Sequence, residues 1–388
     1  MTAADFGGLG VIPVNEPLLD GNEKKYLTEC IETGWISSEG PFVARFEKEM
    51  AALTGRRHGI AVCNGTAALE VALSTLDLKP GDEVVMPAFT ILSCAAAVVR
   101  RGGVPVLVDS DPVTWNFDLE KLEAKLKNEI GCNNNRRIKA IMVVHIYGLP
   151  VDMDPVLELA SRYGLKVIED AAQMHGQQYK GRACGSFGDL STFSFYPNKH
   201  ITTGEGGMVL TDDDALAERC RSLRNLCFQA KKRFVHEDLG FNYRMTNMQA
   251  ALGVAQLERI DEFVARKRQM GRRYTEMLAG HEGLTLMPLR TDYAENIYWV
   301  YGVVLKDGIP FDGEEAMRRL GKEGVGTRPF FWPMHEQPVF RKMGLFKDER
   351  FPIAEWLARR GFYIPSGLAL TDEQMDVVVE AMEKVISI

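Results

Sequence analysis

The sequence predicts an α/β fold built on a mostly parallel sheet with helices on both faces. In the first two-thirds of the 388 residues, short apolar strand patterns alternate with amphipathic helical patterns. Residues 83–86, 104–108 and 138–144 are apolar runs of strand length, and the segments between them carry helical spacing. Ligands of such sheets bind at the carboxyl ends of the strands, so polar residues that follow strands are the first candidates for a site.

The expected elements of this larger part follow one another in a regular order. We expect strands at 60–62, 83–86, 104–108, 138–144, 165–168 and 190–195, and helices at 42–53, 67–75, 91–100, 119–128 and 154–163. Each helix repeats apolar residues three or four positions apart, and each strand is a short apolar run between polar or turn residues. A polar stretch at 131–137 predicts a surface loop.

The last third predicts a smaller unit of the same class. A long helical pattern at 245–278 precedes strands at 284–287 and 299–304, and helices are expected at 314–322, 351–360 and 372–385. We therefore divide the chain into a large domain, residues 1–250 with an N-terminal arm, and residues 251–388, a linking helix with a small α/β domain.

Composition excludes several classes of function. The net charge of −7 argues against nucleic-acid and membrane-surface partners, and the longest apolar run, 91–99, is too short to span a bilayer. The seven scattered cysteines form no CxxC pair and no metal-like cluster. Together with the lack of a signal-peptide pattern in residues 1–30, they indicate a cytoplasmic protein with reduced thiols and no metal site.

Lys199 is the strongest candidate for chemistry. It lies between the strand pattern at 190–195 and a glycine-rich turn at 204–207. Most lysines are solvated surface groups, but the apolar residues before this one predict an interior position. Burial lowers the pKa of an amine and makes it a nucleophile that can form a Schiff base, so we expect Lys199 to be catalytic.

Asp170 is a second candidate residue for the same chemistry. It ends the apolar run 167–170, where it could also cap the strand or pair with a surface arginine. A carboxylate beside the ring nitrogen of pyridoxal phosphate (PLP) makes that ring an electron sink. Lys199 and Asp170 together therefore predict PLP chemistry, and Gln173, three residues after Asp170, is a candidate partner for the phenolic oxygen of the cofactor.

A phosphate cup is expected where the strand 60–62 meets the next helix. Gly65, Thr66 and Ala67 lie at that helix start, where free N–H groups and the helix dipole favour an anion, although the threonine is also a common N-cap. Ser194 is a second candidate for the phosphate. Phe89 follows a strand and could stack on the pyridine ring or pack in the core.

Other polar residues are candidates for substrate and interface contacts. Asn242 precedes the long helix and could reach a phosphate across a dimer interface, or simply begin the helix. Lys231, Arg233 and Arg328 could bind an anionic substrate, although short basic runs are usually solvated loops. His335 follows an aromatic and proline-rich turn and could contact substrate or belong to the turn alone.

Taken together, these motifs resemble the DegT/DnrJ/EryC1/StrS family of sugar aminotransferases, from about residue 14 to the C-terminus. The matching landmarks are Gly34-Trp-Ile-Ser-Ser38, Asn64-Gly-Thr-Ala-Ala68, Pro87-Ala-Phe-Thr90, His145-Ile-Tyr-Gly-Leu-Pro150, Glu169-Asp-Ala-Ala-Gln173, Gly204-Glu-Gly-Gly207 and Gly240-Phe-Asn-Tyr-Arg-Met245. The resemblance implies the aspartate aminotransferase fold, known as fold type I of PLP enzymes, in a homodimer with sites at the subunit interface.

The resemblance also implies roles for the site residues. Lys199 would bind PLP covalently, Asp170 would pair with the ring nitrogen, and Gln173 would contact the phenolate. Phe89 would stack on the ring, and the phosphate would be bound by Gly65, Thr66, Ala67 and Ser194, with Asn242 from the partner subunit. Trp35 joins the four candidates above as a substrate contact. The substrates implied are a nucleotide-linked 4-keto-6-deoxy sugar and L-glutamate as amino donor.

Three segments resemble the branch of the family that makes GDP-perosamine, a deoxysugar of O-antigen and lipopolysaccharide biosynthesis. They are 195–207, 242–250 and 328–335, and Pro197 departs from the glycine expected there. UDP- or dTDP-linked sugars aminated at C4 or C3 remain alternatives, as does a PLP-binding regulator without turnover. The dehydratase branch has histidine in place of the Schiff-base lysine, and Lys199 argues against it.

Overall fold

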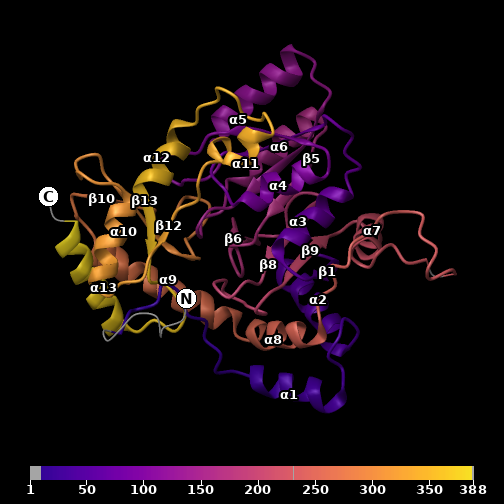
Figure 1. The fold of residues 1–388 in the computed structure, drawn as a ribbon, viewed down its shortest axis with the longest axis horizontal. Coiled ribbons are helices and arrows are strands. Elements are labelled where there is room, and N and C mark those ends of the chain that lie inside the picture. Colours follow the sequence, from indigo (N-terminus) through magenta and orange to yellow (C-terminus); the bar gives the residue numbers. More distant parts are fainter. Residues whose placement is uncertain (1–9, 230, 387–388) are drawn as a thin grey trace.

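The main sheet of the protein has seven strands in the order β1–β9–β8–β5–β4–β2–β3, and Figure 1 shows the whole fold. The structure is a computed structural model that describes residues 10–229 and 231–386. The strands β8, β5, β4, β2 and β3 run parallel, and β9 is antiparallel to both of its neighbours. In sheet order the bounds are His58–Val62, Gly207–Thr211, Leu190–Ser194, Lys166–Asp170, Ile138–Val144, Glu83–Pro87 and Val104–Val108. The predicted α/β class with a mixed, mostly parallel sheet is confirmed.

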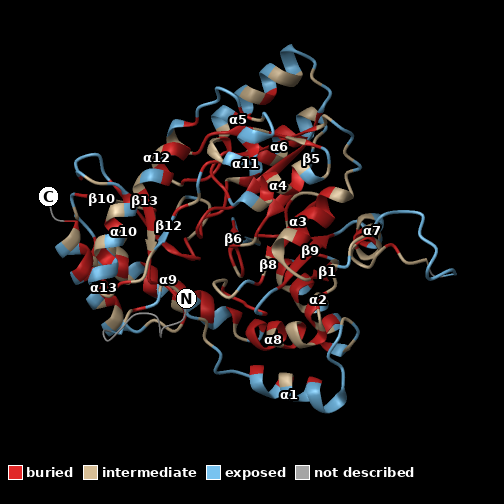
Figure 2. Ribbon diagram, viewed as in Figure 1, coloured by how far each residue is buried: buried red, intermediate tan, exposed pale blue. Residues whose placement is uncertain are grey.

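Both faces of this sheet are covered by helices. Along β4, Ile141 and Val143 belong to one buried cluster, whereas Met142 and Val144 belong to another on the opposite face. Because side chains alternate along a strand, this division shows that the sheet is buried on both sides, and its strands are red in Figure 2. One face is covered by α2 (Pro41–Thr54), α5 (Leu119–Leu126), α6 (Met153–Tyr163) and α8 (Asn247–Leu257), and the other by α3 (Gly65–Ser74), α4 (Leu92–Arg100), α7 (Asp214–Arg224) and α12 (Pro352–Arg360).

Local sequence signals set the ends of these helices. Thr246 and Gln249 form a reciprocal capping box at the start of α8, in which the side chain of each residue accepts a hydrogen bond from the backbone N–H of the other. At the other end of a helix, Gly55 stops α2 with a left-handed φ of 70°, which costs a residue without Cβ little. Such signals explain why helix positions are readable from sequence.

The second sheet is small and antiparallel, in the order β10–β11–β13–β12. Its strands are Leu284–Leu286, Tyr301–Leu305, Gly361–Ile364 and Arg328–Pro329, and α10 (Gly313–Lys322) and α13 (Asp372–Val385) pack on it. The N-terminal arm joins this unit: the N–H of Ile12 donates to the Gly324 carbonyl at 2.9 Å, and the Ser366 N–H donates to the Val14 carbonyl at 3.0 Å. The described part of the arm therefore packs on the smaller unit.

Several shorter elements connect these layers. They are α1 (Glu23–Thr33), the π-helical turn Lys127–Cys132, the two-stranded β6–β7 (Gln178–Tyr179 and Arg182–Ala183), the 3-10 turn Met334–Glu336 and α11 (Pro338–Lys342). No helix in the described ranges is both long and apolar enough to cross a membrane.

The helix expected at 245–278 is interrupted. It forms two helices, α8 and α9 (Ile260–Met277), and Glu258 and Arg259 lie in a turn between them. Glu258 accepts a hydrogen bond from the Tyr26 hydroxyl at 2.6 Å, and Arg259 pairs with Asp20, so both fasten the N-terminal segment.

The division at residue 250 stays a proposal, and the packing favours a later boundary. The first half of α9, up to Val264, belongs to the core of the large unit, whereas Met270 and Tyr274 belong to the core of the small one. We propose that the domain boundary lies within α9, between Val264 and Met270.

Candidate active site

One cavity of about 600 Å³ lies at the carboxyl ends of β1, β5 and β8. Its wall brings together most of the residues that the sequence predicted for cofactor binding, which are Gly65, Thr66, Ala67, Asp170, Gln173, Ser194 and Lys199. The strand ends explain this meeting: Asp170 ends β5, Ser194 ends β8, and Gly65 begins the helix after β1. These strands are neighbours or near-neighbours in the sheet, so residues distant in sequence share one rim.

Lys199 lies in a turn after β8, where its backbone N–H donates to the Tyr196 carbonyl at 2.9 Å. Its amine is enclosed by protein, while part of the residue is accessible on the cavity wall. Burial lowers the pKa of this amine from 10.5 to about 7, although the nearby Asp170 carboxylate and Cys94 thiol act in the opposite direction. An amine with this pKa is largely neutral at physiological pH and can attack a carbonyl carbon.

Asp170 lies on the same cavity and is only 3% exposed. Its carboxylate accepts hydrogen bonds from the Ala172 N–H at 3.0 Å and from the Cys94 thiol at 3.3 Å. Burial raises the pKa of this carboxyl above 3.8 in spite of these donors and of the charge of Lys199. A cationic ring nitrogen brought next to it would favour its ionised form.

The start of α3 forms a cup that a phosphate group fits. Asn64 caps the helix by accepting the Ala67 N–H at 2.8 Å, and the hydroxyls of Thr66 and Ser93 lie 2.9 Å apart. A Cβ on Gly65 would lie 2.7 Å from the Ser194 Cβ, so only glycine allows the helix start to touch β8. Helix N–H groups, hydroxyls and a positive dipole end meet there, which is a favourable environment for an anion.

Further contacts support a cofactor in the cavity. The Gln173 carbonyl oxygen accepts the Tyr147 N–H at 2.6 Å, which leaves the amide NH2 group of this cavity residue to face a ligand oxygen. The Thr192 hydroxyl is buried on the same wall with no hydrogen-bond partner in the described ranges. A lysine with a lowered pKa, a buried carboxylate, an anion cup and an unpaired hydroxyl therefore fit PLP.

Phe89 does not line the cavity, and its stacking role stays a prediction. Phe89 is fully buried and packs on Tyr147, Phe330 and Phe331, with ring centroids 5.8 to 6.0 Å away. The chain before it stays paired with β3 beyond the end of β2, since the Ala88 N–H donates to the Val108 carbonyl at 2.8 Å. Ile91, two residues later, is the side chain of this turn that lines the cavity.

None of the five predicted substrate residues lines this cavity. His335 is buried, and its Nε2 lies 3.0 Å from Glu355, which also pairs with Arg350, so this histidine holds the fold together. Arg328 is exposed on β12 beside Tyr363, which does line the cavity. The other three are exposed: Trp35 after α1, and Lys231 and Arg233 between α7 and α8. Their substrate roles stay predictions.

Asn242, expected to act across a dimer interface, is exposed and pairs with Asn225 in an isolated bridge. Its neighbour Tyr243 reaches the cavity and donates its hydroxyl to Glu70 at 2.7 Å. Two more residues on the wall, Trp299 and Tyr363, come from the C-terminal unit. Sequence reasoning missed these aromatic residues because nothing in their local sequence distinguishes them from core residues.

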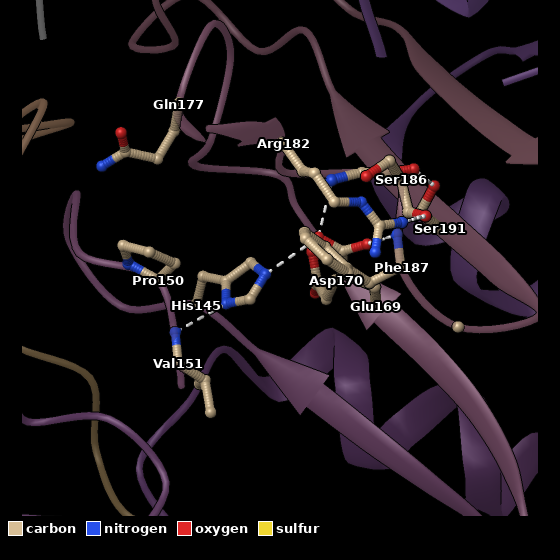
Figure 3. Close-up of polar contacts among 12 residues, drawn as sticks. His145, Pro150, Val151, Glu169, Asp170, Gln177, Arg182, Ser186, Phe187 and Ser191 are labelled. Carbon is tan, nitrogen blue, oxygen red and sulfur yellow. Dashed lines mark hydrogen bonds and ion pairs between the residues drawn. The ribbon is translucent and has the colours of Figure 1, made fainter. Parts of the chain in front are cut away.

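A buried polar pair lies beside the site, directly after β4 (Figure 3). His145 Nδ1 accepts the Val151 N–H at 3.0 Å, so Nε2 carries the proton and donates to Glu169 at 3.0 Å. Glu169 also accepts the N–H groups of Gly185 at 2.6 Å and Phe187 at 2.9 Å. The pair therefore fixes the segment after β7 to the strand that carries Asp170.

The fold and the cavity define a PLP-dependent enzyme of fold type I, in which a lysine bonds the cofactor. The chain belongs to the DegT/DnrJ/EryC1/StrS aminotransferase family, whose sequence profile matches residues 17–383. The predictions of an aminotransferase and of PLP as its cofactor are thereby confirmed.

Known relatives of this chain include GDP-perosamine synthases. That of Caulobacter vibrioides is 43% identical over 375 residues, which cover 97% of this chain and 98% of that protein. That of Escherichia coli O157:H7 is 38% identical, with coverage of 96% and 98%. Among solved structures, the aminotransferase TlmJ of Streptoalloteichus hindustanus superposes with a TM-score of 0.88 at 30% identity, covering 97% of this chain and 99% of TlmJ.

Proposed function

We propose that this chain transfers the amino group of L-glutamate to C4 of GDP-4-keto-6-deoxy-D-mannose and so forms GDP-perosamine. The observation that carries the reaction type is the meeting of Lys199, Asp170 and the start of α3 on one cavity. The choice of sugar is supported by the 43% identity to a protein named for that product. A UDP- or dTDP-linked keto sugar, aminated at C4 or C3, is the alternative substrate.

In this proposal each cavity residue has a distinct task. PLP, when bound, supplies an aldehyde that bonds to amines and a ring that accepts the electron pair of a carbanion. Lys199 Nζ would bond that aldehyde at rest and, once displaced, would take a proton from the glutamate α-carbon and deliver it to the former aldehyde carbon of the cofactor. With the sugar, Lys199 moves a proton in the reverse direction. An amine with a pKa of about 7 suits both steps, because it gains and loses a proton near neutrality.

The other residues orient the cofactor. Asp170 would hold the ring nitrogen in its protonated form, and Gln173 would donate to the phenolic oxygen. Gly65, Thr66, Ala67 and Ser194 would bind the phosphate at the start of α3. Such fixed contacts place the reacting carbon next to Lys199 and so contribute through proximity rather than through bond chemistry.

We also propose a homodimer in which Asn242 faces the cavity of the partner subunit. The segment between α7 and α8 extends away from the rest of the chain on the right of Figure 1. It carries Phe234, Val235 and Leu239 with exposures of 81%, 55% and 94%. Apolar side chains gathered on one exposed segment are typical of interfaces. We place the enzyme in the cytoplasm, because its seven cysteines are free thiols.

The test is a turnover assay of the purified protein with PLP and ¹⁵N-labelled glutamate. GDP-, UDP- and dTDP-linked 4-keto-6-deoxy sugars are supplied separately, and both 2-oxoglutarate and labelled amino sugar are measured. We expect label at C4 of the GDP sugar only. Label in a UDP or dTDP sugar alone would replace the proposed substrate, and bound PLP without any labelled sugar would favour the regulator.

A further inference from the structure

Trp299 forms the wall of the cavity directly beside the reactive amine. It precedes β11 in the C-terminal unit and is only 4% exposed. The Nζ atom of Lys199 lies 3.7 Å from the centroid of its ring. This distance is well inside the range in which an aromatic face attracts an ammonium group.

The indole and the backbone of Trp299 are each held by a hydrogen bond. The indole Nε1–H donates to the Asn198 carbonyl at 2.8 Å, which ties the ring to the residue before Lys199. The backbone carbonyl of Trp299 accepts a hydrogen bond from Lys267 Nζ at 3.1 Å. Lys267 lies on α9, is 3% exposed, and also donates to the Ser366 carbonyl. The ring therefore cannot turn away from Lys199 without breaking its hydrogen bond to Asn198, and Lys267 holds the backbone that carries it.

We propose that Trp299 is a positioning residue, whose ring face holds the Lys199 amine in place and favours its ammonium form while that amine is free of the cofactor. The inference rests on the proposed aminotransferase function, in which Lys199 is displaced and must carry a proton. A lysine side chain is long and flexible, and a released amine would otherwise sample several positions. The ring gives it one position and stabilises the protonated form that the second half of proton transfer requires.

The charged groups around Lys199 show why a neutral partner matters. Asp170 from β5 favours the ammonium form, and the buried Cys94 of α4 acts in the same direction. His175 lies after β5, His200 is the next residue, and Lys267 faces from α9; cationic forms of all three would oppose a charge on Lys199. With PLP bound, the Asp170 carboxylate would pair with the ring nitrogen and be less available to Lys199. The indole face would then remain as the contact on the cavity wall that favours the ammonium form.

The test uses the full-length protein freed of its cofactor, with PLP as the probe. The rate of imine formation between PLP and Lys199 is measured against pH by trapping the imine with borohydride. The labelled peptide is identified by mass spectrometry. The variants are Trp299→Phe and Trp299→Leu, and Trp356→Phe on α12 is the control. Only the neutral amine captures PLP, so the midpoint of the profile reports the acidity of Lys199. We expect a midpoint lower by about one pH unit in Trp299→Leu and by roughly half a unit in Trp299→Phe.

The direction of the shift separates this role from simple packing. A Trp299→Leu cavity that merely admitted water would raise the midpoint, because water stabilises the ammonium form. A raised or unchanged midpoint in both variants overturns the inference, while capture by the wild type leaves the proposed function standing. A wild type that captures no PLP at Lys199 overturns the proposed function itself. If Trp299→Leu unfolds, the shift in Trp299→Phe, which keeps a smaller aromatic ring at this position, decides.

Discussion

The thiol of Cys94 donates a hydrogen bond to Asp170, with Sγ 3.3 Å from Oδ2. Burial raises the pKa of this thiol well above 9, so the sulfur keeps the proton that it donates. Thr90 lies next to it, with its hydroxyl 3.4 Å from the same sulfur. The carboxylate proposed to bind the ring nitrogen is therefore oriented from α4, the helix that follows β2.

Removal of that donor should weaken cofactor binding. Cys94→Ala leaves Asp170 with one hydrogen bond fewer in a buried position, and we expect PLP to bind about fivefold more weakly, equivalent to about 1 kcal/mol. Cys94→Ser keeps a donor, and a stronger one, so its affinity should equal or exceed that of the wild type. Equilibrium dialysis with PLP measures both. Equal weakening in the two variants would show that only the volume of the sulfur matters.

The acidity of Lys199 predicts how cofactor capture depends on pH. Burial lowers the pKa of its amine to about 7, so the neutral, reactive form dominates above pH 7. The rate of PLP capture should therefore be constant above pH 7 and fall about tenfold for each pH unit below it. Stopped-flow absorbance after mixing with PLP gives the profile. A rate that still rises up to pH 10 would mean that the amine has the acidity of an exposed lysine.

Substitution of this lysine should abolish the chemistry. Lys199→Ala removes the only amine proposed to bond the cofactor, and we expect loss of the visible absorbance of bound PLP and of transamination. Lys384→Met, an exposed lysine that pairs with Glu323 on the surface, is the matched control and should retain both. Transfer of label from ¹⁵N-glutamate is the measurement, and full activity of Lys199→Ala would remove this residue from its role.

The order of strands explains how much of the site could be predicted from sequence. Lys199 and Asp170 follow apolar runs, and runs of that kind became neighbouring strands whose carboxyl ends share one rim. The start of α3 was predictable for the same reason, because Gly65 and Thr66 come only three and four residues after the end of β1. Local pattern therefore sufficed wherever a residue is placed by the strand immediately before it.

Residues placed by distant contacts were not predictable. The ring of Phe89 packs on Phe330 and Phe331, which lie more than two hundred positions further along the chain. The side chain of His335 is hydrogen-bonded to Glu355. Trp299 reaches Lys199 only because the C-terminal unit contributes to the wall of the cavity at the carboxyl ends of the strands. The helices α1 and α7 and the strands β9 and β13 were missed as well. Charged residues along α7 and glycines at the starts of β9 and β13 obscured their patterns.

The buried pair of His145 and Glu169 predicts a large loss of stability on substitution. His145→Ala leaves Glu169 without one of its three donors, while both side chains are fully buried. We expect a loss of about 3 kcal/mol in the free energy of unfolding, because an uncompensated buried carboxylate is costly. Urea unfolding of the protein without PLP measures it. His58→Ala is the control, since its partner Asp214 is 74% exposed, and it should change stability little.

The contact between Gly65 and Ser194 predicts a selective loss of cofactor affinity. In Gly65→Ala the new Cβ would lie 2.7 Å from the Ser194 Cβ, so the helix start and the end of β8 must move apart. Both residues line the proposed phosphate cup, and overpacking of this kind should weaken PLP binding roughly tenfold.

Gly321→Ala on α10 is the matched control, because no atom lies within 4 Å of its added Cβ. The control should stabilise the protein by about 0.5–1 kcal/mol through helix propensity alone and leave PLP affinity unchanged. Equilibrium dialysis and thermal unfolding of both variants separate the two effects, and unchanged PLP affinity in Gly65→Ala would place the phosphate elsewhere.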